Sequence, residues 1–128
     1  MKVGDLEIYD DFATVKNESI LEAAKIMKEK DVPDLILIDD DNKPIGIISA
    51  VDIILKIVAE EKDPKEIKIA TIARKVKSFD EFATRAEVLR YMMENDSEIV
   101  PIIKKDGTLL GVCTIGDVLI ETKEDEEE

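Results

Sequence analysis

Two stretches of the chain carry the same potential binding residues at the same spacing. Each follows a Gly-x-x-Ser/Thr-x-x-Asp pattern, once as Gly46, Ser49 and Asp52 and once as Gly111, Thr114 and Asp117. A glycine lets a ligand approach the backbone, and a hydroxyl at a helix start can assist the free N–H groups in holding an anion. An aspartate carboxylate can accept two hydrogen bonds from a ribose diol, as an acidic residue does in the dinucleotide-binding fold. The pattern therefore favours a nucleoside as the ligand.

The same residues could instead only stabilise helices. Ser49 with Asp52, and Thr114 with Asp117, are also N-capping pairs, in which the hydroxyl accepts a free backbone N–H. Such a cap contributes about 1 kcal/mol without any ligand. On spacing alone, capping is the favoured interpretation.

The chain is a tandem duplication. When the sequence is shifted by 65 residues against itself without gaps, residues 19–57 align with residues 84–122. The identical pairs include Met27/Met92, Gly46/Gly111 and Asp52/Asp117, and they number eight where composition predicts roughly three. We therefore expect one supersecondary unit twice, with the first over residues 1–62 and the second over residues 63–122. Each includes the segment that leads into it, residues 5–15 or 67–79, which we call its lead-in.

Each repeat predicts a first helix that opens on a capping box. Ser19 with Glu22, and Thr84 with Glu87, have the Ser/Thr-x-x-Glu spacing that satisfies the first backbone N–H groups of a helix. Apolar residues then recur at helical spacing and predict the inward faces. These faces are Ile20, Ala23, Ala24 and Met27 in the first repeat, and Ala86, Leu89, Tyr91 and Met93 in the second.

A β-hairpin and a second helix are expected after each first helix. Aliphatic runs separated by turn formers predict strands over residues 35–38 and 45–49, and again over 99–103 and 109–114. Asp106-Gly107 suits a tight turn. The second helices are expected from about residue 50 to 61 and from about 115 to 122. A short strand near Thr14 or Phe79 is expected beside each hairpin.

Two charged segments mark the ends of the repeats. Residues 60–66 contain Pro64 and predict a short linker. Residues 123–128 are almost all acidic, so like-charge repulsion predicts a disordered tail.

The order of these elements resembles a CBS domain pair, a family named after cystathionine β-synthase, over nearly the whole chain. The resemblance implies an α/β (α+β) fold, in which tandem β-α-β-β-α units pack sheet to sheet with pseudo-twofold symmetry around two clefts. It also implies an adenosine-containing ligand and a homodimer. By position, Asp52 and Asp117 would hold ribose hydroxyls, and Ser49 and Thr114 would lie near the sugar or phosphate.

The family's basic positions predict which adenosyl ligand fits. Several AMP- and ATP-binding members carry cations just before the aliphatic strand or the motif aspartate, whereas this chain has Pro33, Asp34, Glu98, Ile99, Val51 and Gly116 there. Without a nearby cation, like charges would oppose a triphosphate by ~1 to 4 kcal/mol for each pair in contact. S-adenosylmethionine, methylthioadenosine or AMP therefore ranks above ATP. Ile36 replaces a proline that the second repeat keeps as Pro101, so the second cleft is the favoured one.

Charge and composition restrict the partners. The net charge of −13 predicts neither nucleic acid nor a membrane as a partner, since no basic cluster offsets it. The absence of a long apolar run and the single Cys113 favour a cytoplasmic protein. Ile54, Ile57 and Val58 are too apolar to be left in water, which supports the homodimer.

Enzymatic and metal functions are not expected. The chain has no histidine, and Cys113, which alternates with neighbours on a predicted strand, is expected to be a buried apolar residue. Residues 39–42 lack the ligand spacing of a calcium loop and predict a hairpin turn instead. The sequence thus predicts a regulatory module that senses an adenosyl ligand and acts in trans on another protein. The alternative is a ligand-free dimerisation or docking scaffold of the same fold.

Overall fold

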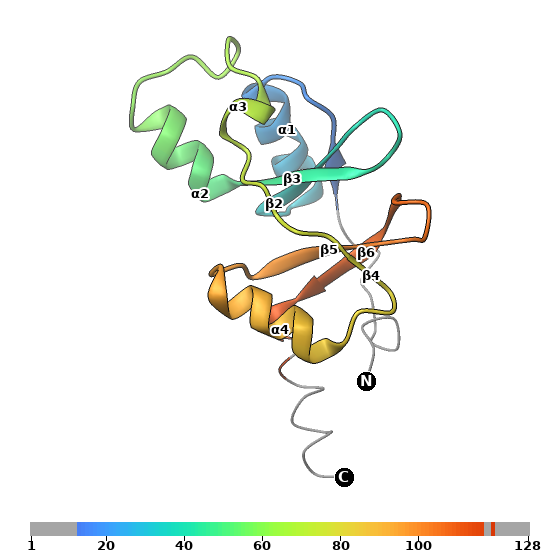
Figure 1. Ribbon diagram of the computed structural model, residues 1–128. Helices are drawn as coiled ribbons and strands as arrows, with labels where there is room; N and C mark the ends of the chain where they lie inside the picture. Colours follow the sequence, from blue (N-terminus) through green and yellow to red (C-terminus); the bar gives the residue numbers. More distant parts are fainter. Residues whose placement is uncertain (1–12, 117–118, 120–128) are drawn as a thin grey trace. The chain divides into compact units, whose positions relative to one another are not determined.

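The computed structural model describes residues 13–116 and residue 119 (Figure 1). Their contacts divide them into two compact units, which we call the first unit (residues 13–76) and the second unit (residues 77–116 and 119). No helix among these residues is long and apolar enough to cross a bilayer.

The first unit is a three-stranded sheet with helices. Its elements are β1 (Thr14–Val15), α1 (Ile20–Lys30), β2 (Asp34–Ile38), β3 (Pro44–Ser49), α2 (Ala50–Ile53), the π-helical turn η2 (Ile54–Val58) and α3 (Ile69–Ile72). The strand order is β1-β2-β3, in which β1 runs parallel to β2 and β3 runs antiparallel to it.

The second unit repeats this sheet. Its elements are β4 (Phe79–Asp80), α4 (Arg85–Glu94), β5 (Ile99–Ile103) and β6 (Leu109–Thr114), with the order β4-β5-β6. The pairing register shifts between Leu37 and Ile38 in the first hairpin, and between Ile102 and Ile103 in the second. These two irregularities lie at equivalent positions of the repeat, so the duplication is confirmed down to the strand register. The predicted short strands beside both hairpins are also confirmed.

The capping boxes begin the helices as expected. The Ser19 hydroxyl accepts the N–H of Glu22 at 3.3 Å, and the Thr84 hydroxyl accepts that of Glu87 at 3.2 Å. In α1, Ile20, Ala23 and Met27 are buried, as predicted.

The predicted inward face of α4 is wrong. Ala86 and Met93 are exposed, Leu89 and Tyr91 are partly buried, and the buried residues are instead Arg85, Val88 and Met92. These three stand at the repeat positions of Ile20, Ala23 and Met27. The helix therefore keeps the phase that the duplication sets, although its own apolar residues are spread over other faces.

The second helix of the first unit is shorter than predicted. It changes from α to π geometry at Ile54 and ends at Val58, not near residue 61. Ile57 is fully buried, whereas Ile54 and Val58 are more than half exposed. The prediction that Ile57 faces a partner subunit was therefore wrong, because this residue belongs to the core. Most of the predicted helix at 115–122, and the acidic tail at 123–128, lie outside the described residues.

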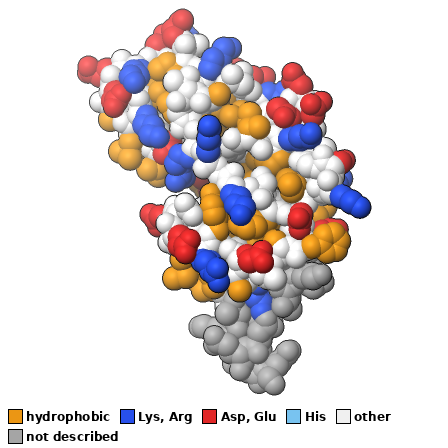
Figure 2. All heavy atoms as spheres, viewed as in Figure 1, with side chains coloured by type: hydrophobic (Ala, Val, Ile, Leu, Met, Phe, Trp, Pro, Cys, Tyr) orange, Lys and Arg blue, Asp and Glu red, His pale blue; other side chains and the backbone are white. Residues whose placement is uncertain are grey.

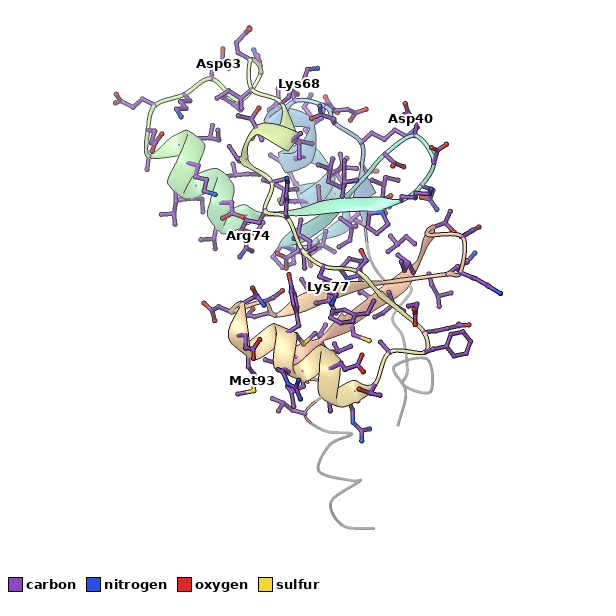
Figure 3. The ribbon with its side chains drawn as sticks, viewed as in Figure 1. Asp40, Asp63, Lys68, Arg74, Lys77 and Met93 are labelled. Atoms are coloured by element: carbon purple, nitrogen blue, oxygen red, sulfur yellow. The ribbon has the colours of Figure 1, made fainter. Side chains whose placement is uncertain are left out.

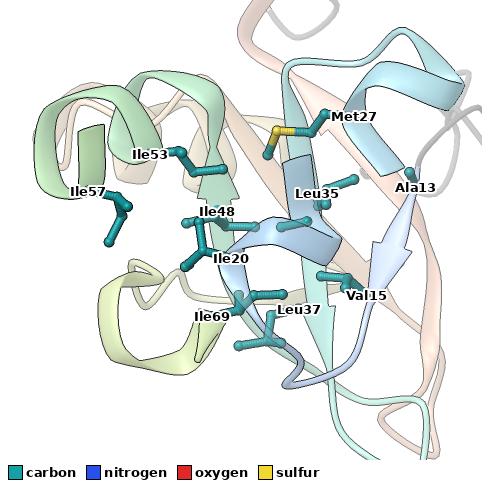
Figure 4. Packing of buried hydrophobic residues seen from close by; sticks show 11 residues of the cluster. Ala13, Val15, Ile20, Met27, Leu35, Leu37, Ile48, Ile53, Ile57 and Ile69 are labelled. Atoms are coloured by element: carbon teal, nitrogen blue, oxygen red, sulfur yellow. The ribbon is translucent and has the colours of Figure 1, made fainter. Parts of the chain in front are cut away.

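The core of the first unit is aliphatic. Figure 4 shows Ile20, Ile48 and Ile69 meeting between the sheet and its helices, and all three are fully buried. Ile69 comes from α3, beyond the predicted repeat boundary at residues 62/63. Its backbone N–H bonds to the Glu18 carbonyl at 2.8 Å, so the lead-in of the second repeat packs on the first unit.

Candidate functional site

Ser49 ends β3 and caps the helix that follows. Its hydroxyl accepts the backbone N–H of Asp52 at 3.1 Å, and the residue is buried. The extended backbone of Ser49 (φ −111°, ψ 157°) lets the strand pass directly into α2. The capping interpretation of this serine is confirmed. The cap uses the N–H of Asp52 and leaves the Asp52 carboxylate for another role.

The Asp52 carboxylate is nearly enclosed. Its side chain is 13% exposed, and its Oδ2 atom is out of contact with solvent and accepts no hydrogen bond. Arg74 Nε lies 3.2 Å from Oδ2 as an ion pair, without the alignment of a hydrogen bond. Lys56 Nζ lies 4.0 Å from Oδ1. The site thus has a buried carboxylate oxygen whose hydrogen-bonding capacity is not used.

Arg74 is the residue that the sequence analysis missed. Its backbone forms two hydrogen bonds with Ile47 on β3, each of 2.9 Å, and its side chain reaches the start of α2 (Figure 3). The expectation that no cation lies near the motif is corrected for the first unit. The sequence analysis considered only cations close to the motif in sequence. Arg74 belongs to the lead-in of the second repeat and lies near Asp52 only in the folded chain.

Gly46 has a different role from the predicted one. A Cβ atom on this residue would lie 3.0 Å from the Arg74 carbonyl oxygen and 3.4 Å from Ala73 Cβ. The glycine therefore admits the Ala73–Arg74 backbone against β3. The prediction that it admits a ligand was wrong, since protein backbone occupies that space.

The second unit reproduces the strand-to-helix junction. Thr114 ends β6 opposite Ile99, as Ser49 ends β3 opposite Asp34. In both units, the residue after this Ser or Thr donates its backbone N–H to a carbonyl at an equivalent repeat position. Ala50 donates to Pro33 at 2.8 Å, and Ile115 donates to Glu98 at 2.9 Å. Asp117, predicted to complete the second site, lies outside the described residues.

Pro101 and Ile36 occupy equivalent places in the two sheets. Pro101 pairs with Val112 on β6, and Ile36 pairs with Ile47 on β3. Both residues are buried in the middle strand of their sheets. The substitution that distinguishes the repeats therefore leaves the strand register unchanged, although Pro101 lacks the N–H that Ile36 donates to the Ala13 carbonyl at 3.0 Å.

The predicted hairpin turn at residues 39–42 is confirmed. The Asp39 carboxylate accepts the backbone N–H groups of Asp41 and Lys43, both at 2.9 Å. Among residues 13–116 and 119, no cluster of three or more His, Cys, Asp or Glu side chains could hold a metal ion. Cys113 is fully buried on β6, as expected.

Comparison with known proteins relates both repeats to one family. The CBS domain model matches residues 3–59 and 65–124. The chain is 27% identical over 120 residues to the uncharacterized protein MK0525 of Methanopyrus kandleri, a match that covers 93% of this chain and 61% of that protein. The whole relative is therefore longer than the part it shares with this chain.

Two solved structures have the same fold. A crystal structure of Hypoxic Response Protein I with two coordinated zinc ions has a TM-score of 0.80 at 26% identity, and the match covers 94% of this chain and 98% of that one. The cytosolic domain of the Mg²⁺ channel MgtE in complex with ATP has a TM-score of 0.79 at 21% identity, over 94% of this chain and 48% of that one. The second similarity shows the fold alone. With both repeats matched by the family model, the chain belongs to the CBS domain family and contains two CBS domains in tandem.

Proposed function

We propose that this protein senses an adenosine-containing small molecule and acts in trans on a partner protein. CBS pairs are in general regulatory ligand-binding modules rather than catalysts. The single observation that carries the proposal is the buried Oδ2 atom of Asp52, which accepts no hydrogen bond. A buried carboxylate oxygen that accepts no hydrogen bond is unfavourable, so a ligand hydroxyl that reaches it when the half-exposed Arg74 side chain moves aside would stabilise the site.

A ribose diol matches this requirement. Its two O–H groups can donate to the two oxygens of one carboxylate. Asp52 and Ser49 would hold the sugar in the first unit, and Asp117 and Thr114 would do so in the second. The MgtE domain has the same fold and was solved in complex with ATP, which supports an adenosyl ligand for this protein.

The ranking of ligands places S-adenosylmethionine, methylthioadenosine and AMP above ATP. In the first unit, the cations that form ion pairs with Asp52 are Arg74 and Lys56. Asp34 pairs with Ser49 across the sheet and adds a negative charge at this end of the strands. Two cations beside two carboxylates do not compensate the charge of a triphosphate.

A homodimer is the proposed assembly. Val51, Ile54, Leu55 and Val58 form an exposed apolar stripe on α2 and η2, each of them at least 55% exposed. Figure 2 shows hydrophobic side chains in the region of this helix. A helix that is apolar on its outer face as well as its inner one is typically buried on both. We place the dimer in the cytoplasm, which suits the reduced, buried Cys113.

The second candidate is a ligand-free scaffold. It is favoured by the ion pair between Asp52 and Arg74, because this pair already neutralises the carboxylate without any ligand. Thermal melting with adenosine, AMP, ATP, methylthioadenosine and S-adenosylmethionine separates the two functions. A ligand at 100 times its Kd adds ~2.7 kcal/mol to the free energy of unfolding. No shift in melting temperature with any of the five compounds would favour the scaffold.

A further inference from the structure

The second unit contains a pocket of about 280 Å³ between α4 and the end of the second lead-in. Its helical lining residues are spaced at i, i+3, i+4 and i+7 and so share one face of α4; they are Glu87, Arg90, Tyr91 and Glu94. Lys77 and Phe79 complete the lining. None of the described residues of the Gly-x-x-Ser/Thr-x-x-Asp motifs belongs to it, so this pocket differs from the site at Asp52.

The apolar part of the pocket is a pair of aromatic rings. Phe79 is buried, and its ring centroid lies 5.6 Å from that of Tyr91 with 70° between the ring planes, an edge-to-face contact. Lys77 Nζ lies 5.0 Å from the Phe79 centroid. The backbone N–H of Lys77 donates to the Tyr91 hydroxyl oxygen at 2.9 Å. The Tyr91 O–H therefore keeps its proton for a further acceptor.

The charged groups of the pocket are two cations and two carboxylates, namely Lys77, Arg90, Glu87 and Glu94. None of the four forms an ion pair with another described residue. In the first unit, Glu22 and Lys25 stand at the repeat positions of Glu87 and Arg90, and they do pair at 3.6 Å. The pocket thus presents both signs of charge, and each charge is available to a ligand.

The two rings are a feature of the second repeat alone. Phe79 pairs with Ile102 as Val15 pairs with Leu37, so it stands at the sheet position of Val15. Tyr91 stands at the helix position of Ile26. The first unit builds the same sheet and helix with aliphatic side chains, so the fold does not require this aromatic pair. Binding of a ligand gives the pair a purpose that folding does not.

A free α-amino acid matches the groups that line the pocket. We infer that the pocket in the second unit binds a free α-amino acid with an apolar side chain. The Arg90 fork and the Lys77 ammonium suit the carboxylate of the ligand, and Glu87 and Glu94 suit its ammonium group. The side chain of the ligand would then pack on the aromatic rings.

The size of the pocket supports an amino acid over a nucleotide. Its 280 Å³ lies just below the range of about 300–1,000 Å³ that is typical of small-molecule sites. Its lining carries as many positive as negative charges in a chain of net charge −13, which favours a zwitterion over an anion or a cation. This inference goes beyond the proposed function and does not depend on it.

An NMR titration of the full chain tests the inference, because amide shifts report both affinity and location. The probes are L-leucine, L-methionine and L-phenylalanine. At least one should produce saturable shifts at Lys77 and along residues 87–94, with a Kd of about 1 mM or tighter. Glycine keeps both charges without a side chain and should bind at least about tenfold more weakly. The N-acetyl and amide derivatives of the best binder each lack one charge and should also lose about tenfold or more.

Substitutions in the pocket separate its charges from its rings. Arg90→Gln should weaken the best binder about tenfold or more, because a charged hydrogen bond is lost. Tyr91→Phe keeps the ring without the hydroxyl and should weaken it about three- to tenfold. Lys105→Gln is the control, since it removes one exposed cation of the same unit that does not line the pocket, and it should bind as the parent does. Thermal melting of each variant without ligand reports on folding.

Any of three results would overturn the inference. The first is the absence of saturable shifts with all three amino acids at up to about 10 mM. The second is saturable shifts confined to residues outside the pocket. The third is equal affinity for the amino acid and its single-charge derivatives, or equal affinity of Arg90→Gln and the parent. No adenosyl compound enters this titration, so failure here leaves the proposed function to its own test.

Discussion

Arg74 Nε lies 3.2 Å from Oδ2 of Asp52, although Arg74 belongs to the lead-in of the second repeat and Asp52 to the Gly-x-x-Ser/Thr-x-x-Asp motif of the first. The contact exists because the Arg74 backbone pairs with Ile47, two residues before the end of β3, and β3 leads directly into the helix that carries Asp52. The motif of the first CBS domain is therefore completed by a residue from the chain segment that leads into the second.

Replacing the motif aspartates should affect binding more than folding. We expect Asp52→Ala and Asp117→Ala each to weaken adenosyl binding at one site by about ten- to a hundredfold, the effect of losing a charged hydrogen bond worth ~1.5 to 3 kcal/mol. The Ser49 cap survives in Asp52→Ala, because it uses the backbone N–H. Ser49→Ala should instead lower the free energy of unfolding by about 1 kcal/mol.

Calorimetry and thermal melting on these variants measure the two effects. Asp40→Ala is the control, since this carboxylate is 95% exposed and forms a surface ion pair with Lys16. Unchanged affinity in Asp52→Ala, with a lowered melting temperature, would show that Asp52 has a structural role only.

Adding a methyl group at Gly46 should detach Arg74 from β3. The new Cβ of Gly46→Ala would lie 3.0 Å from a backbone oxygen, so the Arg74 segment has to move. We expect a loss of about 1 to 3 kcal/mol in urea unfolding, the usual cost of overpacking. Gly116→Ala is the matched control, because its Cβ would meet only Thr114 Oγ1 at 4.0 Å. Equal stability of the two variants would refute the steric role of Gly46.

The exposed apolar stripe should control the oligomeric state. Light scattering at micromolar concentration is expected to give twice the 14.4 kDa mass of one chain. Val58→Glu should give the monomer, because a charge replaces a residue that is 64% exposed in the isolated chain and would be buried in the dimer. Met93→Glu, at an equally exposed position of the second unit, should leave the dimer intact. A wild-type monomer would rule out the proposed assembly.

The turn of the second hairpin should show an acid-sensitive interaction. The hydrogen bond from the Thr108 hydroxyl, at 2.6 Å, holds the pKa of Asp106 below its ordinary value, and the Thr108 N–H adds to this effect. A carboxyl with a lowered folded-state pKa adds stability above its unfolded pKa and loses it as the pH falls through the folded one. Thr108→Val should therefore raise the Asp106 pKa, which an NMR titration measures. Thr108→Ser keeps the hydroxyl and should preserve the low value; an unchanged pKa in Thr108→Val would exclude the hydroxyl as the cause.

Local patterns predicted most elements of the fold. The capping boxes at Ser19 and Thr84, the aliphatic hairpins and the turn at Asp106-Gly107 depend on contacts between residues close in the chain, which a sequence displays directly. The prediction of the inward face of α4 was wrong because this face depends on tertiary packing and not on local contacts. Its phase follows the packing of the duplicated unit, so that Arg85 takes the buried position of Ile20, against the preference of its side chain.

The sequence by itself determined the duplication, the family and the repeated Gly-x-x-Ser/Thr-x-x-Asp motif, because each of these is a pattern along the chain. Only the tertiary structure decided that Ile57 faces the core and that Gly46 makes room for protein rather than ligand. It also decided the charge of the site. Arg74 reaches Asp52 through backbone pairing between segments far apart in sequence, and no local spacing encodes such a contact.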